Sequence, residues 1–175
     1  QAFEKIADKG TEGNAVFVSR ADKSGTNTLE LNIWSKLGIT PQNTTQAWYI
    51  EAGASMGIVL RMANEMSAYT LTDRATWLAK RSQLANMVIL VQSDKLLLNP
   101  YAMILVNPEK YPQRNYRMAV ALIKFMISEE GQNLMANFTK EGEILFTPIA
   151  HNIELAKTLG FPDQEQEVTW YSAQT

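Results

Sequence analysis

Residues 14–38 read NAVFVSRADKSGTNTLELNIWSKLG and hold three different patterns in a row. The mostly apolar start, 14–19, predicts a buried strand, and the polar residues 20–25 predict a loop. Residues 26–37 then predict a helix, with Gly38 as its C-cap. A strand that leads through a short loop into a helix is the repeating unit of α/β proteins.

The same order of elements returns twice along the chain. Residues 47–51 predict a second strand, which a loop at 52–55 joins to a helix that ends near Met66. Residues 69–71 predict a third strand, and 73–80 begin the next helix. This repetition favours an α/β fold with a parallel or mixed sheet, and it brings the loops together at the carboxyl ends of the strands.

Two extended apolar runs, 87–91 and 101–106, follow this repeating part. They are long enough for strands, and we interpret them as a crossing between two lobes. Residues 10–91 are therefore expected to form one α/β lobe. Residues 1–9 and 92–175 are expected to belong to the other lobe, which also has a mixed sheet.

The last third of the chain predicts helices. Residues 113–128 predict a long amphipathic helix, whose apolar face has four residues at helical spacing: Met118, Leu122, Phe125 and Met126. Ser128 and the two acidic residues after it are typical of a helix start, so a further helix is expected to run to Phe138. Residues 146–148 predict a short final strand.

Composition argues against several classes of function. The chain has 175 residues, of which 46% are hydrophobic and 19% are charged, as in ordinary globular proteins. Its net charge of -2 and its scattered Lys and Arg residues argue against nucleic acid or an anionic membrane surface as a partner. With no Cys and with His151 as its single histidine, it is not expected to bind a metal or a cofactor. No apolar run reaches the roughly 20 residues of a membrane helix.

The loop at 20–26 carries groups that suit an oxyanion. A helix that begins here offers unpaired backbone N–H groups and a partial positive charge. Gly25 allows close approach of the backbone, and Ser24 and Thr26 add hydroxyl donors. Arg20 adds a planar set of N–H donors. In the alternative interpretation, the loop only caps the helix and Arg20 forms a surface ion pair.

Two later loops contain further candidate contacts. Ser55, Met56 and Gly57 open the helix after the second strand, and Arg74 opens the helix after the third. The alternatives are that Ser55 is an N-cap and that Arg74 pairs with a nearby carboxylate. Asp73 is expected to cap its helix, because a carboxylate that faced a bound anion would repel it.

Five segments carry a resemblance to a known family. They read VSRADKSGT at 18–26, WYIE at 48–51, Gly53 with Met56-Gly57, YTLTDRAT at 69–76, and NPY at 99–101 with VNP at 106–108. In this order they resemble the signature segments of the TupA family, the periplasmic tungstate-binding proteins of ABC importers. The resemblance implies the type II periplasmic-binding-protein fold.

The same resemblance implies transport rather than catalysis. It implies an oxyanion held by Arg20, Ser24, Gly25 and Thr26. The ligand is then tungstate or molybdate, the partner is an ABC transporter permease, and the location is periplasmic or extracytoplasmic. The runner-up is the ligand-sensing domain of a transcription regulator, which uses the same fold. A third option is an enzyme that acts on phosphorylated substrates.

The chain departs from the family at two places. Members usually have Gly at the position of Ala21, and a methyl group is tolerated there unless the loop requires a positive φ. Members also have, before the position of Gln1, roughly half of the first lobe. We therefore expect the first lobe of this chain to be incomplete, and we expect the chain to self-associate through the apolar surface that this exposes.

Overall fold

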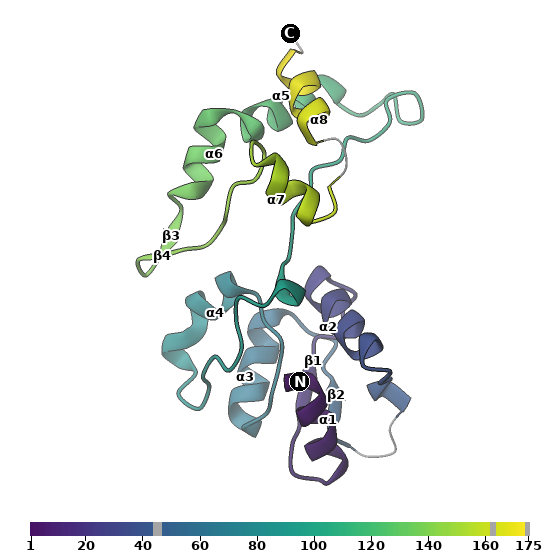
Figure 1. The fold of residues 1–175 in the computed structure, drawn as a ribbon, viewed down its shortest axis with the longest axis vertical. Coiled ribbons are helices and arrows are strands. Elements are labelled where there is room, and N and C mark those ends of the chain that lie inside the picture. Colours follow the sequence, from purple (N-terminus) through teal and green to yellow (C-terminus); the bar gives the residue numbers. More distant parts are fainter. Residues whose placement is uncertain (44–46, 162–163, 174–175) are drawn as a thin grey trace. The chain divides into compact units, whose positions relative to one another are not determined.

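The structure is a computed structural model and describes residues 1–43, 47–161 and 164–173. It divides into two compact units, Gln1–Asn99 and Pro100–Thr175, and each unit has a core of its own (Figure 1). Both units combine helices with short strands, which confirms the predicted α/β class.

A small parallel sheet lies at the centre of the first unit. β1 (Phe17–Ser19) pairs in parallel with β2 (Tyr49–Glu51), in a register that places Phe17 opposite Tyr49. On its other side, β1 makes a parallel bridge from Phe17 to Tyr69. The first two predicted strands are therefore present but shorter than expected, and the third predicted strand is reduced to an isolated bridge at Tyr69.

Helices and 3-10 turns make up about half of the described part of the first unit. They are α1 (Ala2–Thr11), α2 (Gly25–Lys36), α3 (Met56–Met66) and α4 (Arg74–Lys80), with the 3-10 turns η1 (Pro41–Asn43), η2 (Arg81–Gln83) and η3 (Lys95–Leu97). The helix predicted at 26–37 is α2, one residue earlier at each end. Gly38 follows its C-cap with a φ of +71°, the left-handed conformation that this position after a helix requires.

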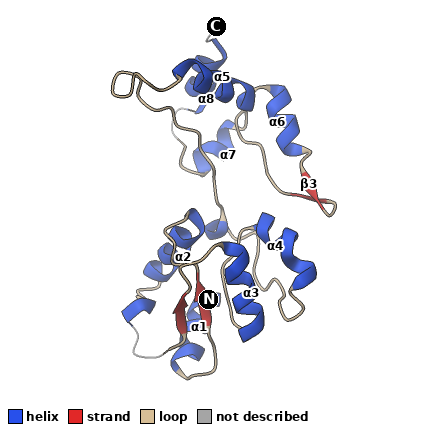
Figure 2. Ribbon diagram, turned by 180° about the vertical axis from the view of Figure 1, so that it is seen from behind, coloured by secondary structure: helices blue, strands red, loops and turns tan. Residues whose placement is uncertain are grey.

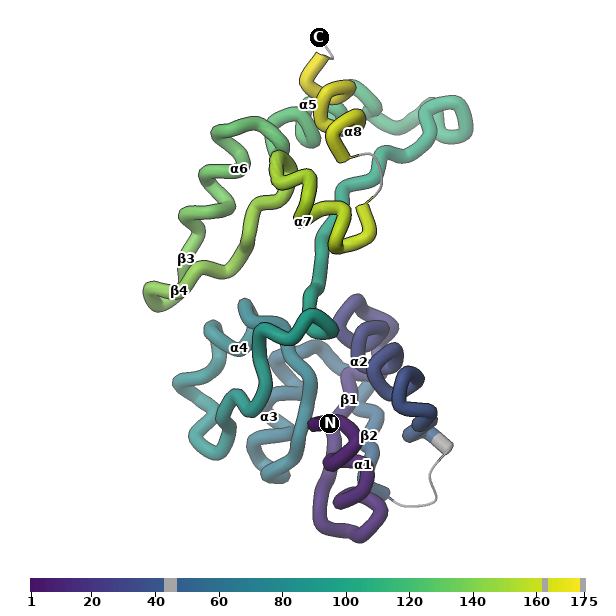
Figure 3. The backbone as a smooth tube through the Cα atoms, in the orientation of Figure 1, coloured from purple at the N-terminus to yellow at the C-terminus, as the bar shows by residue number. Residues whose placement is uncertain are grey.

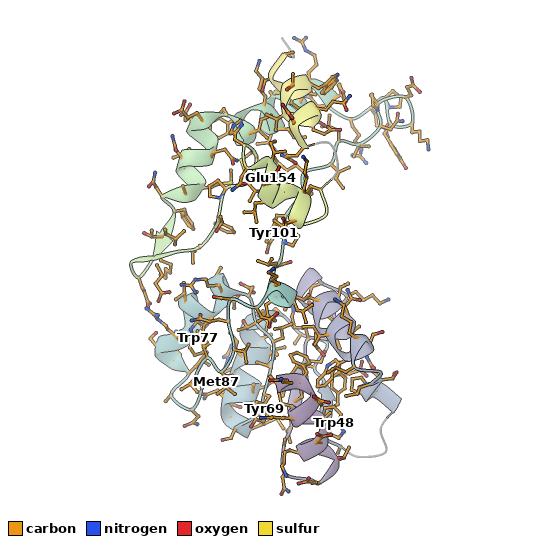
Figure 4. All side chains as sticks on the ribbon, in the orientation of Figure 1. Trp48, Tyr69, Trp77, Met87, Tyr101 and Glu154 are labelled. Carbon is orange, nitrogen blue, oxygen red and sulfur yellow. The ribbon has the colours of Figure 1, made fainter. Side chains whose placement is uncertain are left out.

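The two faces of β1 bury different clusters, because successive side chains of a strand point to opposite faces. Val18 packs with apolar residues of α3, and Trp77 and Met87 cover this cluster (Figure 4). Phe17 packs on the other face with Trp34 of α2, with ring centroids 5.3 Å apart. The strand is apolar at consecutive positions because both of its faces are covered.

Helix α1 packs within the first unit. The ring centroid of Phe3 lies 4.5 Å from that of Trp34 and 5.5 Å from that of Phe17. The units divide after residue 99, whereas the sequence grouped residues 1–9 with the later part of the chain and ended the first group at residue 91. That grouping concerned the lobes of the family fold, and it stays a prediction.

The apolar runs at 87–91 and 101–106 belong to no strand, so the strand expected at 101–106 is wrong. After α4 the chain returns past α3, where the Asn86 N–H donates to Asn64 Oδ1 at 3.0 Å, and then reaches η3 (Figure 3). A strand needs a partner for its N–H and C=O groups, and neither run has a ladder partner in the described residues.

The second unit is mainly helical. Its described elements are α5 (Tyr116–Ile127), α6 (Glu129–Ala136), β3 (Thr139–Lys140), β4 (Glu143–Ile144), α7 (Ile153–Thr158) and α8 (Gln164–Ala173). β3 and β4 form an antiparallel hairpin, and the strand predicted at 146–148 lies outside it, which corrects that prediction. Ser128 caps α6 as predicted, because its Oγ accepts the Gly131 N–H at 3.1 Å.

The apolar face predicted for α5 is largely exposed. Met118 and Leu122 are 65% and 57% exposed, whereas Ile123 and Ile127 are buried with Ala150. The stripe of α5 that contributes to the core of this unit is therefore the one with Ile123 and Ile127, next to the predicted face. Helical spacing alone does not distinguish these two stripes, since both carry apolar residues. The buried stripe is the one that packs against Ala150 and α8.

Candidate anion site

The loops after the parallel strands meet at one edge of the sheet (Figure 2). The Ala52 N–H donates to the Ser19 carbonyl at 3.0 Å, and the Ala54 N–H donates to the Arg20 carbonyl at 3.1 Å. The second predicted loop is therefore bonded to the first. Next to the Tyr69 bridge, Thr70 Oγ1 donates to the Val18 carbonyl at 2.8 Å, which ties the start of the third segment to β1. The expected meeting of the first two loops is confirmed, and that of the third loop stays a prediction.

The first loop is tightly turned between β1 and α2. Asp22 Oδ1 accepts the Ser24 N–H at 3.1 Å, and Ser24 Oγ accepts the Asn27 N–H at 3.3 Å, which caps α2. Ala21 and Lys23 have φ values of 49° and 59°, so two residues with side chains take the left-handed conformation. The loop is thus held in a shape that its residue types do not favour.

Arg20 and Asp22 form an ion pair inside this loop. Arg20 donates to Asp22 Oδ2 from Nε at 3.0 Å and from one Nη. Hydrogen bonds from Ser24, and then from Arg20, hold the pKa of Asp22 below its ordinary value. The ion pair that the sequence allowed as an alternative is therefore formed, while the second Nη of Arg20 makes no hydrogen bond within the described chain.

The start of α2 leaves two backbone donors without an acceptor. Four neighbouring N–H groups each donate to a protein oxygen: those of Lys23, Ser24, Asn27 and Thr28. Among the residues that the structure describes, nothing accepts from the N–H groups of Gly25 and Thr26, as expected in the first turn of a helix. These amides and the Thr26 hydroxyl form a group of donors at the positive end of α2.

The second loop offers less than the sequence predicted. Ser55 precedes α3, is exposed and makes no capping hydrogen bond. Met56 is buried in the core beside Val18, so its side chain is not available to a ligand. A Cβ on Gly57 would lie 3.6 Å from Lys80 Cε, which shows that Gly57 faces α4. Only Ser55 and the backbone amides of this helix start remain as candidates.

Arg74 begins α4 and is exposed, with its Nη1 3.5 Å from Gln92 Oε1. Asp73 caps the helix: its two carboxylate oxygens accept the backbone N–H and the hydroxyl of Thr76, both at 2.7 Å. The predicted capping role of Asp73 is confirmed.

The sequence did not single out four polar residues that the structure places at or beneath the first loop. Ser19, Asn27 and Glu30 are buried under it, and Asn99 Oδ1 lies 3.7 Å from where a Cβ on Gly25 would stand. A charged residue on a helix ordinarily indicates a solvated position. The available signal was the spacing of Glu30, four residues before Trp34 on a helix face that is otherwise core.

The described residues hold no group of three or more acidic or histidine side chains that would suit a metal ion. The single histidine, His151, lies in the second unit with Nε2 2.7 Å from the Ile127 carbonyl. No helix in the described ranges is both long enough and apolar enough to span a membrane.

Two curated relatives of this chain are tungstate-binding proteins. The family description "PBP superfamily domain" matches residues 1–130. The tungstate-binding protein TupA of Peptoclostridium acidaminophilum is 42% identical over 151 residues, which cover 85% of this chain and 50% of that protein. This chain spans about half the length of the curated relatives it matches.

Solved structures agree with this comparison. The tungstate ABC transporter structure from Geobacter sulfurreducens is 42% identical, with a TM-score of 0.65 over 79% of this chain and 56% of that chain. The tungstate-binding protein TupA from Desulfovibrio alaskensis G20 is 36% identical, with a TM-score of 0.67 over 84% of this chain and 58% of that chain. The predicted periplasmic-binding-protein fold and the resemblance to tungstate-binding proteins are confirmed. The chain therefore belongs to the PBP superfamily.

Proposed function

We propose that this chain binds a tetrahedral oxyanion, tungstate or molybdate, as part of an extracytoplasmic solute-binding protein that delivers it to an ABC transporter permease. The observation that carries the proposal is the group of donors at the start of α2. The N–H groups of Gly25 and Thr26 and the remaining Nη of Arg20 lie on one short loop and its helix start. The names of the relatives support the choice of oxyanion.

These donors suit an anion for electrostatic reasons. The chain as a whole has a net charge of -2, so attraction must come from local groups. A helix N-terminus supplies oriented N–H groups with a partial positive charge, and a guanidinium supplies charge-assisted hydrogen bonds. Both act on the oxygens of a tetrahedral anion without a metal. The proposal includes no catalytic step.

Asp22 has a defined place in this proposal. Its carboxylate accepts from Arg20 Nε and from the Ser24 N–H, which orients the guanidinium and the loop together. An anion then approaches the second Nη of Arg20 while the first pair of donors stays on Asp22. The negative charge of Asp22 weakens the attraction, so Arg20 has to offset two anionic partners.

Calorimetric titration of this chain with tungstate, molybdate and sulfate tests the proposal. Tungstate should give a saturable signal, and Arg20→Ala should weaken it by at least about tenfold, because a hydrogen bond to a charged group contributes about 1.5–3 kcal/mol. Arg61→Ala removes an exposed arginine from α3 and is the matched control, which should bind as the wild type does. Unchanged affinity in Arg20→Ala, or no saturable signal with any of the three anions, would contradict the proposal.

A further inference from the structure

Three buried polar side chains lie beneath the candidate anion loop. Ser19 ends β1, Asn27 and Glu30 lie on α2, and their exposed fractions are 0%, 3% and 2%. Burial of polar groups is unfavourable unless each is hydrogen-bonded, so their partners define what the cluster does.

Glu30 accepts hydrogen bonds from three donors. Its Oε2 accepts from Ser19 Oγ at 2.8 Å. Its Oε1 accepts from the Tyr49 hydroxyl at 2.7 Å and from Trp34 Nε1 at 3.2 Å. An indole N–H can only donate, so the oxygen that faces it has to accept. An ionised carboxylate, which only accepts, matches this arrangement at every contact.

Because Ser19 donates its hydroxyl hydrogen to Glu30, its oxygen can only accept the other hydrogen bonds that it makes. Its hydroxyl hydrogen points to Glu30, so its lone pairs accept from the Ala21 N–H and from Asn27 Nδ2, both at 3.3 Å. The amide of Asn27 is thereby oriented, because its nitrogen faces Ser19 and its Oδ1 accepts the Lys23 N–H at 3.0 Å. The chain of hydrogen bonds thus runs from Glu30 to the backbone of two loop residues.

Those two residues are the ones in this loop that take a strained conformation. Ala21 and Lys23 have positive φ values, which residues with a Cβ disfavour. A residue stays in such a conformation only where its surroundings fix it. The N–H groups that the buried cluster holds are those of Ala21 and Lys23 themselves.

We propose that Glu30 is a positioning residue of the candidate anion site, which acts through Ser19 and Asn27 to hold the 20–24 backbone in the shape that presents the Gly25 and Thr26 amides. The inference rests on the proposed function for the identity of the ligand. The hydrogen-bond geometry that supports it does not depend on any ligand.

A neutral amide at position 30 would reverse one bond. The Oε1 position has two donors facing it, so the amide nitrogen of Gln would take the Oε2 position and donate to Ser19 Oγ. Ser19 would then face three donors with its own hydrogen left without an acceptor. The longest contacts, to Ala21 and Asn27 at 3.3 Å, would be the first to break.

Amide hydrogen exchange by NMR on this chain, without ligand, tests the positioning role. In Glu30→Gln the Ala21 and Lys23 amides should exchange at least about tenfold faster than in the wild type, because each loses an ordered acceptor. Tyr49→Phe is the matched control, since it also removes a donor from Glu30 but leaves the charge and the Ser19 contact. Unchanged exchange in Glu30→Gln, or an equal rise in Tyr49→Phe, would overturn the inference.

Tungstate titration of a double-mutant cycle tests the link to binding. Glu30→Gln and Ser19→Ala should each weaken tungstate binding about tenfold, and the double variant should be no weaker than Ser19→Ala alone, because Glu30 acts through Ser19. Additive losses would overturn the inference, since they would indicate independent roles. If the wild type gives no tungstate signal, the proposed function fails, while the exchange experiment still decides the role of Glu30.

Discussion

Ser19 Oγ donates a 2.8 Å hydrogen bond to the Glu30 carboxylate, and both side chains are almost fully buried. Burial raises the pKa of Glu30, and hydrogen bonds from its donors offset part of that effect. A buried charge with good partners often contributes little to net stability, while it does constrain geometry. The pair therefore fits a role in shaping the loop better than a role in overall stability.

Substitution of Ala21 by Gly should stabilise the chain. Ala21 has a φ of 49°, and the left-handed conformation costs a residue with a Cβ about 1–2 kcal/mol, whereas Gly loses about 0.5–1 kcal/mol more backbone entropy on folding. We expect the free energy of unfolding in urea to rise by about 0.5–1 kcal/mol, the net of these two terms. The loop therefore does require a positive φ at residue 21, which is the case in which the methyl group of Ala21 is unfavourable.

The control for this experiment is Ala79→Gly, at an exposed position inside α4. Gly in place of Ala lowers helix stability by up to about 1 kcal/mol, so this change in the last turn of α4 should lower the free energy of unfolding. If Ala21→Gly lowers stability to the same extent as Ala79→Gly, the positive φ at residue 21 is not a source of strain.

Thr26→Val should weaken tungstate binding less than Arg20→Ala does. It removes one neutral hydroxyl donor at the start of α2, which corresponds to about 0.5–1.5 kcal/mol or roughly two- to tenfold in affinity. Thr28→Val makes the same change at an exposed position two residues later and should leave the affinity unchanged. Calorimetry measures both, and equal losses in the two variants would indicate an effect on the helix rather than a contact with the anion.

Local patterns predicted the strand-loop-helix order of the first unit and the helix caps of both units well. The strand-loop-helix order between 17–19 and 25–36 depends on neighbouring residues, and the caps at Ser24, Asp73 and Ser128 follow from side chains that reach their own helix start. The apolar run at 101–106 was misread because an apolar segment becomes a strand only if a distant segment pairs with it, and a local pattern does not contain that information.

The sequence predicted where the candidate site lies, but it did not predict all of the residues that support the site. The meeting of the loops follows from parallel strands, and the Ala52 to Ser19 hydrogen bond confirms it. The role of Glu30 was missed, since a glutamate on a helix is ordinarily solvated and only three-dimensional contacts show that Tyr49 and Trp34 surround it.

Exposed apolar side chains in the second unit predict self-association of this chain. Ile104 is 88% exposed, and Met118 and Leu122 lie one helical turn apart on α5, both exposed. Apolar surface of this kind favours association. Light scattering should show a dimer or larger species, and Leu122→Lys should shift it toward monomer, whereas Asn133→Lys, at an exposed polar position on α6, should not. A wild type that stays monomeric at high concentration would contradict this prediction.

The pH dependence of unfolding distinguishes Glu30 from Asp22. Burial raises the pKa of Glu30 above its ordinary 4.5, so its stabilising contribution is complete below that pH and is lost as the pH rises through the folded pKa. Hydrogen bonds lower the pKa of Asp22 from 3.8, so its contribution is complete well above that value and is lost as the pH falls toward the folded pKa. From about pH 5 to about pH 8, urea unfolding should therefore show the stability of the wild type falling relative to Glu30→Gln but constant relative to Asp22→Asn. A constant difference from Glu30→Gln over this range would mean that burial does not perturb Glu30.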